Sequence, residues 1–208
     1  MQHDGYVQYG CGLCAPSTWT NFDASPTLRL QRMPLIGSVF GRNTKFPVNA
    51  RYGDVVRGLP IDANSCQAVY CSHVLEHLSL NDLRTALKHT YEYLKPGGTF
   101  RFVLPDLEQL ARDYLSSEAA QPASWFMEAA HLGAPNRARG MMGFLREWMG
   151  NSKHLWMWDE RSMTVELKQA GFVDIRRAQC GDSGDKRFAD VEDADRWVKC
   201  LGMQCRRG

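Results

Sequence analysis

The sequence predicts a single α/β domain built on a mostly parallel β-sheet. Short apolar runs alternate with amphipathic helical stretches along most of the chain. The segment from Ala68 to Leu104 has the order strand, helix, glycine turn and strand, which is the pattern of a right-handed parallel crossover. A chain of 208 residues has room for one well-buried core but hardly for two. We therefore expect one domain over residues 1–208, with helices on both faces of the sheet.

Seven short segments are predicted to form the strands. The first stops at Gly10-Cys11-Gly12, the second at Asp23, and Asp54 lies near the end of the third. The predicted strands are Tyr6–Tyr9, Thr18–Phe22, Arg51–Val56, Ala68–Cys71, Thr99–Leu104, Val173–Ala178 and a last strand within residues 195–206.

Helical spacing of apolar residues identifies three of the connections. One helix ends at Lys95-Pro96-Gly97-Gly98, and the other two are Asp106–Ser117 and Arg161–Ala170. Residues 26–50 contain several prolines and glycines, which predicts a loop with one short helix. Asp23 follows Gly12 by only eleven residues, so the crossover helix between the first two strands must be very short or replaced by a loop.

Residues 118–150 differ in character from the rest. They are too apolar for a plain linker and too interrupted by glycine and arginine for one regular helix, and methionine suits a pliable pocket wall. We expect a helical insertion that forms a lid or part of an acceptor pocket. Its large apolar residues are Trp125, Phe126, Met127, Met141, Met142, Phe144, Trp148 and Met149.

Composition excludes several classes of protein. The formal net charge of +2 and the lack of any basic stretch longer than a pair give no reason to expect a nucleic-acid partner. No apolar run reaches the roughly 20 residues of a membrane span, and the N-terminus lacks the layout of a signal peptide. Seven scattered cysteines, with Cys11 and Cys14 as a lone CxxC pair, indicate reduced thiols rather than a disulfide framework or a zinc site. We expect a cytoplasmic protein.

The glycine turn and the acid that follows it suggest a nucleotide-like ligand. Glycine lets the backbone approach a ligand closely, and an acidic residue after the next strand is the usual partner of ribose hydroxyls. Two glycines alone equally suit a plain tight turn. A dinucleotide-dependent oxidoreductase would need a fuller G-x-G-x-x-G that opens a helix, and residues 12–16 do not supply it.

A series of motifs in order adds a more specific signal. The chain contains GCG, NFD, GDVVRGLP, VYCSHVLEHL, YLKPGGTFRFVLPDLE and LKQAGFVDIRR. This series resembles the class I S-adenosylmethionine-dependent methyltransferases, in particular small members with an SHxLEHL…LKPGG…PDL pattern. The resemblance covers roughly residues 6–117 and 154–180. It implies a Rossmann-like, doubly wound sheet of seven strands whose last strand is antiparallel, and S-adenosylmethionine as cofactor, with S-adenosylhomocysteine as product.

The resemblance also implies roles for individual residues. Gly10 and Gly12 would form the floor under the methionine part of the cofactor, with Cys11 contributing its backbone. Asp23 would hold both ribose hydroxyls, since a carboxylate can accept two hydrogen bonds. Asp54 would accept a hydrogen bond from the adenine amino group beside Val55, and Ser72 and His73 would line the methionine portion.

Two residues depart from the broader family pattern. Gln8 stands where many class I enzymes carry an acid, and Cys14 where a third glycine would fall. Gln8 could still accept a hydrogen bond from the cofactor's ammonium group, but without charge assistance. A catalytically silent methyltransferase-like binding protein is therefore an alternative to the enzyme.

The motifs indicate the catalytic residues and the methyl acceptor less directly than they indicate the cofactor. His73, which titrates near neutrality, is a candidate general base or a pocket wall, and Asp106 is a second candidate base. The Cys71-Ser72-His73-Val74 turn lacks the Pro-Pro-aromatic and Pro-Cys patterns of nucleic-acid methyltransferases. We expect O- or N-methylation of a small-molecule or saccharide-type acceptor. We expect no nucleic-acid partner, and a homodimer is a possibility that the sequence leaves open.

The block from His73 to His77 also matches the HxxEH signature of zinc hydrolases. Two histidines four residues apart would share a helix face, but the motif follows directly on a strand rather than lying in a long helix. We expect no metal among the site residues. Glu76 and His77 are then supports that pin a short helix to the glycine turn, Asp159 is a helix cap, and His154 and Trp156 are weaker candidates for the acceptor side.

Overall fold

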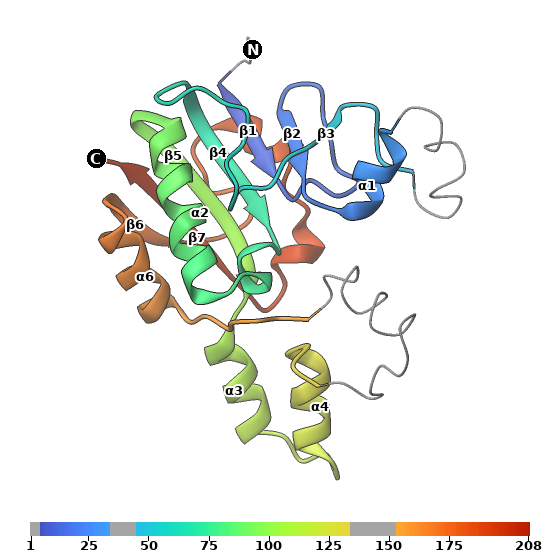
Figure 1. Cartoon of the computed structure of the whole chain (residues 1–208). Helices are drawn as coiled ribbons and strands as arrows, with labels where there is room; N and C mark the ends of the chain where they lie inside the picture. The colour runs from blue at the N-terminus through green and yellow to red at the C-terminus, as the bar shows by residue number, and fades with distance from the viewer. Residues whose placement is uncertain (1–4, 34–44, 134–152) are drawn as a thin grey trace.

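The structure, a computed structural model, describes residues 5–33, 45–133 and 153–208. Its centre is a seven-stranded sheet of order β3-β2-β1-β4-β5-β7-β6 (Figure 1). Strands β1 to β5 are parallel, and β7 is antiparallel to both β5 and β6, which confirms the predicted sheet. The strands are β1 Tyr6–Tyr9, β2 Thr20–Asp23, β3 Ala50–Tyr52, β4 Cys66–Ser72, β5 Leu94–Pro105, β6 Phe172–Ala178 and β7 Cys200–Arg207.

The helices connect and flank these strands. The α-helices are α1 Pro26–Gln31, α2 Leu80–Tyr93, α3 Leu107–Leu115, α4 Pro122–Ala129 and α6 Glu160–Gln169, and the short 3-10 helices are η1 Leu75–His77, η2 Lys186–Asp190 and η3 Ala194–Trp197. Asp159 caps α6 through a capping box with Ser162, as predicted. No helix in the described part of the chain is long and apolar enough to cross a membrane.

Several observed strands have bounds that differ from the predicted ones. Strand β2 begins at Thr20, β4 extends over Cys66–Ser72, and β5 begins at Leu94, so that it includes the stretch predicted as the helix-terminating turn. The third strand ends at Tyr52, so Asp54 and Val55 lie in the turn after it rather than within it. The last begins at Cys200 rather than near residue 195. The Asp193 side chain accepts a hydrogen bond from the Asp195 backbone N–H, and this cap starts η3 where the sequence suggested a strand.

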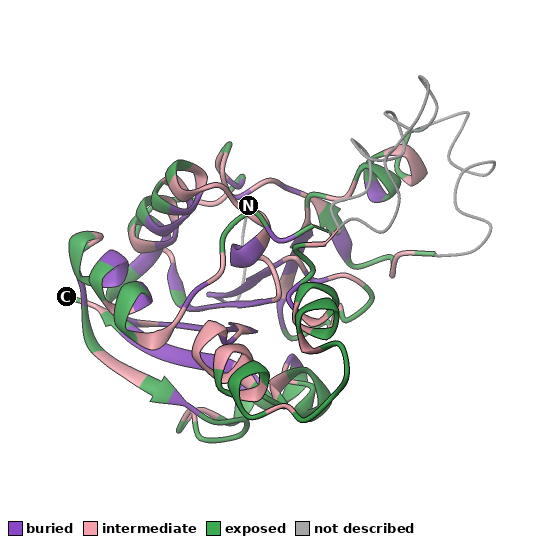
Figure 2. Cartoon of the chain, turned by 90° about the horizontal axis from the view of Figure 1, so that it is seen from below, coloured by how far each residue is buried: buried purple, intermediate pink, exposed green. Residues whose placement is uncertain are grey.

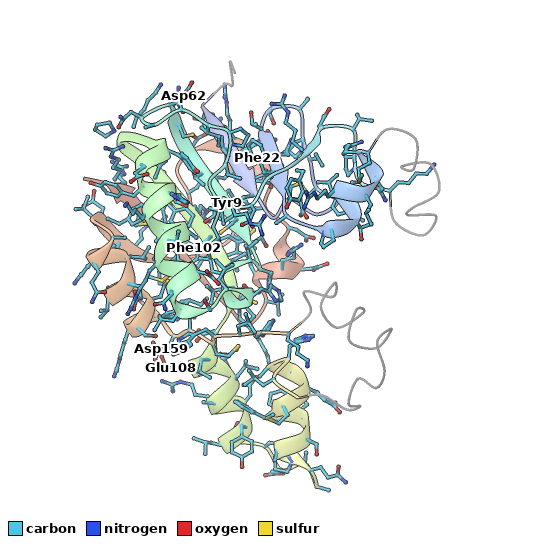
Figure 3. All side chains as sticks on the ribbon, in the orientation of Figure 1. Tyr9, Phe22, Asp62, Phe102, Glu108 and Asp159 are labelled. Carbon is cyan, nitrogen blue, oxygen red and sulfur yellow. The ribbon has the colours of Figure 1, made fainter. Side chains whose placement is uncertain are left out.

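Helices α2 and α6 cover one face of the sheet (Figure 1). Helix α2 begins at the Ser79 cap and buries Leu83, Ala86 and Leu87 at helical spacing. These residues meet Tyr9, Phe22 and Phe102, which extend from three strands into the same core (Figure 3). This face is a conventional helix-on-sheet layer.

The opposite face is covered by the connection between β6 and β7, residues 179–199. Tyr6, Trp19 and Tyr70 of this face pack against Phe188 of η2, and the rings of Trp19 and Phe188 lie 5.3 Å apart. The indole N–H of Trp19 donates to the carbonyl of Arg187 at 3.0 Å. Residues 10–19 form turns without a helix, as predicted, so a long-range segment does the covering that a crossover helix would otherwise do.

A buried guanidinium fixes that covering segment to the sheet. Arg101, in the middle of β5, is fully buried. Its Nε pairs with Glu192, its Nη1 donates to Asp182 at 2.8 Å and to Gln204 at 3.0 Å, and its Nη2 donates to the Gln179 carbonyl at 2.6 Å. The guanidinium also lies 4.7 Å from the centre of the Trp197 ring. Each nitrogen is satisfied by a group from residues 179–204, so the network joins β5 and β7 to the connection.

Removing this charge should destabilise the protein strongly. An Arg101→Met variant leaves the Glu192 carboxylate, whose side chain is 2% exposed, without its partner. Breaking a buried pair from one side costs about 3–5 kcal/mol. The matched control is Arg176→Met, since Arg176 is a surface partner of the same Asp182 and exposed pairs contribute up to about 1 kcal/mol. Urea unfolding measures both, and equal losses would contradict the network's importance.

The same network predicts a pH dependence. Hydrogen bonds from Arg176 and, with smaller effects, from the Gln179 backbone and Arg101 outweigh burial and hold the pKa of Asp182 well below its usual value of 3.8. A carboxyl group with a lowered folded-state pKa stabilises the fold above its unfolded pKa, and this contribution is lost as pH falls through the folded pKa. The melting temperature of Asp182→Asn should therefore lie below that of the parent at about pH 7, and the gap should narrow below about pH 4. A gap that is independent of pH would refute this.

Candidate functional site at the carboxyl edge of the sheet

The parallel register brings the predicted site residues to one edge of the sheet. Tyr9 of β1 pairs with Phe22 of β2 and with Cys71 of β4, and Asp23 pairs with Tyr52. The residues that follow these positions therefore leave the sheet side by side. Asp62, just before β4, lies at the opposite end of the molecule from Glu108, just after β5, which shows the direction of the central strands (Figure 3). This carboxyl edge is where open α/β sheets bind ligands.

The glycine turn after β1 has a conformation that requires glycine. Gly10 and Gly12 have φ angles of +68° and +53°. A Cβ on Gly10 would lie 2.1 Å from Cγ2 of Val74, so this glycine lets the segment before η1 pack directly on the turn. A Cβ on Gly12 would meet no atom of the described chain within 4 Å. The turn is therefore closed on the side of η1 and open at Gly12.

Asp23 faces this opening. Its Oδ2 accepts from the Gly12 N–H at 2.8 Å and its Oδ1 from the Ser25 N–H at 2.8 Å. Each oxygen has a second lone pair, so the carboxylate is oriented by the backbone and can still accept from a diol. Burial and then the charge of Asp23 raise the pKa of the neighbouring Cys11 thiol to about 12, which keeps the thiol neutral. Cys11 is thus a buried packing residue here rather than a redox group.

Asp54 and Val55 form the next corner of the edge. Asp54 Oδ1 accepts from the Val56 N–H at 2.9 Å, and its Oδ2 lies 3.4 Å from Nε of Arg57. Val55 is buried, and its carbonyl accepts a 2.7 Å hydrogen bond from Nδ1 of His89 on α2. Helix α2 therefore fixes the position of this turn relative to the glycine turn.

Gln8 lies inside β1 rather than at its end and is almost fully buried. Its amide nitrogen donates to the Cys14 carbonyl at 2.7 Å and to Oδ1 of Asn21 at 2.5 Å. Asn21 in turn donates to the Pro16 and Trp19 carbonyls. This chain of amides holds the loop of residues 10–19 in place of a crossover helix.

Ser72 and His73 end β4 against the covering connection. His73 has a φ of +54°, and its Nε2 lies 3.0 Å from the Arg196 carbonyl, while Arg196 donates to the Ser72 carbonyl at 3.0 Å. Its Nδ1 lies 3.2 Å from Oε1 of Glu76. Burial alone would lower the pKa of His73, but contacts with Cys200, Glu76 and the Arg196 carbonyl raise it to about 10. Both ring nitrogens face oxygen acceptors, an arrangement that favours the protonated ring.

Asp106 occupies the end of β5, where it caps α3. Its Oδ1 accepts from the backbone N–H groups of Glu108 and Gln109, and its Oδ2 accepts from Arg177 Nη2 at 2.5 Å. The residue is 2% exposed. These contacts give Asp106 the geometry of a helix cap and an ion-pair partner.

Helices α3 and α4 extend beyond this edge (Figure 1). They contact each other through Tyr114 and Phe126, whose rings lie 5.6 Å apart, and neither helix contains a buried residue (Figure 2). Trp125 and Met127 are about two-fifths exposed. The helical part of the predicted insertion thus lies at the carboxyl edge, while Met141, Met142, Phe144, Trp148 and Met149 fall outside the described residues.

The HxxEH block does not form a zincin-like helix. His73 lies before η1 in a left-handed backbone conformation, so His73 and His77 do not share a helix face. Sequence reasoning also missed Arg196, which contacts both Ser72 and His73 from more than a hundred residues away. No local signal marks such a contact, because it depends on the path of residues 179–199.

Comparisons with known proteins identify the family of this chain. The model of the family described as a methyltransferase domain matches residues 10–176. A comparison with curated proteins finds no match.

Three solved structures illustrate the similarity in fold. An S-adenosylmethionine-dependent methyltransferase from Thermotoga maritima is 14% identical, with a TM-score of 0.51 over 100% of this chain and 84% of that one. One from Mesorhizobium loti is 17% identical, with a TM-score of 0.50 over 97% and 90%. One from Archaeoglobus fulgidus is 12% identical, with a TM-score of 0.50 over 97% and 85%.

The family match covers the glycine turn, Asp23, the edge formed by β4 and η1, and the strand that leads into the covering connection. The seven-stranded sheet and its flanking helices are similar in overall fold to the solved methyltransferases. The chain therefore belongs to the methyltransferase domain family and has the class I S-adenosylmethionine-dependent methyltransferase fold.

Proposed function

We propose that this protein transfers the methyl group of S-adenosylmethionine to a hydroxyl or amine of a small-molecule or saccharide-type acceptor. The observation that supports this best is the meeting of the open glycine turn and the oriented Asp23 carboxylate at the carboxyl edge. The modest net charge of +2 favours such an acceptor over a nucleic acid.

The residues at this edge fit the parts of the cofactor. Asp23 has a free lone pair on each oxygen for the two ribose hydroxyls. Asp54 Oδ2 is available to the adenine amino group, and Val55 supplies an apolar neighbour. Gly10, Cys11 and Gly12 would form the floor under the methionine portion, with Ser72 and His73 as its wall. When bound, the cofactor supplies an electrophilic methyl group on a sulfonium.

We propose that His73 positions the site rather than acting as a general base. Nε2 of His73 faces the Arg196 carbonyl at 3.0 Å and Nδ1 faces the Glu76 carboxylate at 3.2 Å, so both ring nitrogens are engaged and neither is directed at a methyl-acceptor group. Asp106 is similarly engaged as the α3 cap and the partner of Arg177. The contribution of this chain is then alignment and exclusion of water, which suits an in-line displacement by an amine that binds in its neutral form, the methylated product then releasing its proton to water. A hydroxyl acceptor would need to lose its proton to a base other than these two residues.

Gln8 supports a second candidate function. Its amide nitrogen is committed to Cys14 and Asn21, so it shapes the loop and offers no charge to an ammonium group. A protein that binds the cofactor without turning it over would fit this feature. Methyl-acceptor screening that detects S-adenosylhomocysteine formation distinguishes the two, because a silent binding protein binds the cofactor but forms no product.

Calorimetry with S-adenosylmethionine and S-adenosylhomocysteine tests the shared requirement of both functions. We expect both ligands to bind. The product has an uncharged thioether in place of the sulfonium, but it keeps the ribose and the adenine that Asp23 and Asp54 would contact. If neither ligand binds at millimolar concentration, both proposed functions, the enzyme and the silent binding protein, are wrong.

Asp23→Asn should weaken binding of S-adenosylhomocysteine by roughly 10- to 100-fold, because a hydrogen bond to a charged group contributes about 1.5–3 kcal/mol. The amide keeps the size of the carboxylate but lacks its charge and one of its acceptors. Asp62→Asn is the matched control, since Asp62 is exposed at the opposite end of the sheet (Figure 3) and should leave the dissociation constant unchanged. Equal affinities of parent and Asp23→Asn would mean that the ribose lies elsewhere.

A further inference from the structure

A second cluster of ligating groups lies at η1, which follows the end of β4. Glu76, His77 and His154 each offer one ligating atom, and these atoms all lie within 4.8 Å of one another. Glu76 and His77 come from η1, whereas His154 comes from the strand-like segment that leads to α6. The cluster is thus assembled by the fold and not by sequence spacing.

The burial of Glu76 is unusual for a carboxylate. The residue is 1% exposed, and neither of its oxygens accepts a hydrogen bond from a described residue. Oε1 faces His73 Nδ1 at 3.2 Å and lies 3.9 Å from His77 Nε2, whereas Oε2 has no hydrogen-bond partner among the described residues. A buried carboxylate with unsatisfied lone pairs is costly unless a cation coordinates it.

The two histidines are prepared as ligands. His77 Nδ1 lies 3.0 Å from the Lys153 carbonyl, and since a carbonyl can only accept, Nδ1 holds the proton and Nε2 offers its lone pair towards Glu76. A carbonyl behind the ring is the usual way in which proteins orient a metal-binding histidine. His154 is buried, and its Nδ1 has no hydrogen-bond partner in the described chain.

Backbone contacts keep the two halves of the cluster together. The Glu76 carbonyl accepts from the Leu155 N–H at 2.8 Å and from the Trp156 N–H at 3.2 Å. The rings of His77 and His154 meet edge to face at 5.1 Å between their centres. The segment of residues 153–156 is therefore docked on η1 by bonds that need no metal.

From this geometry we infer that Glu76, His77 and His154 bind one divalent transition-metal ion of the Zn²⁺ or Co²⁺ type. Two imidazoles and one carboxylate suit such borderline ions better than Mg²⁺ or Ca²⁺, which prefer oxygen ligands. Bonds of about 2.0–2.1 Å in a tetrahedral site require each ligand atom to move inward by roughly 1 Å at most. Three protein ligands leave a further position for water or an acceptor oxygen. This differs both from our expectation of no metal and from the HxxEH pattern, since His73 is not a ligand.

Metal titration of the chelator-treated full-length chain tests the site without any cofactor. We expect one equivalent of Zn²⁺ to bind, and Co²⁺ to give ligand-field bands without thiolate charge-transfer absorption. His77→Gln and His154→Gln should each lose more than the roughly 10- to 100-fold that removal of an outer-shell partner costs. His89→Gln is the matched control, because His89 contacts Val55 on another part of the edge, and it should bind Zn²⁺ like the parent.

Binding that persists in the His77→Gln/His154→Gln double variant, thiolate bands with Co²⁺, or no binding at all would overturn the site. The melting temperature with and without Zn²⁺ is a second measurement, and it can be made on the parent as well as on the variants. Zn²⁺ should raise the melting temperature of the parent and of His89→Gln but not that of Glu76→Gln. Because these measurements omit S-adenosylmethionine, their failure would leave the proposed methyl transfer standing, and failure of cofactor binding would leave the metal site standing.

Discussion

The buried guanidinium of Arg101 is the interaction on which the rest of the structure depends. A charge in the middle of a central strand is tolerated only when every donor is satisfied, and here the acceptors come almost entirely from the β6–β7 connection and from β7. The connection is thereby held over the face that holds Tyr6, Trp19 and Tyr70. Without that anchor, the turns of residues 10–19 would leave the face open, because they form no helix to cover it.

The same connection also completes the candidate site. Trp197 lies against the Arg101 guanidinium, and its neighbour Arg196 contacts the Ser72 carbonyl and the His73 ring. The network in the core is therefore coupled to the left-handed turn at His73, and through His73 to the buried Glu76. A site at the carboxyl edge of the first four strands is shaped by residues close to the C-terminus.

The features of the fold and the site that the sequence predicted are those that depend on residues close together in the chain. The apolar runs and the glycine turns located every strand, and Asp23 and Asp159 followed from their positions at the end of a strand and the start of a helix. The start of β7 was wrong because the Asp193 cap forms a 3-10 turn that has no apolar periodicity. Arg101 gave no signal, since a lone arginine within an apolar strand looks solvent-facing until its distant partners are known.

His73 shows how tertiary contacts change the chemistry that a residue type suggests. A histidine at the end of β4 suggests a base, because its ordinary pKa lies near neutrality. The contacts with Cys200, Glu76 and the Arg196 carbonyl outweigh burial and raise that pKa to about 10, which turns the ring into a donor. His77, four residues later, faces a carbonyl through Nδ1 and keeps the lone pair on Nε2. The HxxEH pattern treats the two rings as equivalent, but in the folded chain both ring nitrogens of His73 face acceptors, whereas His77 has a hydrogen-bond partner among the described residues only at Nδ1.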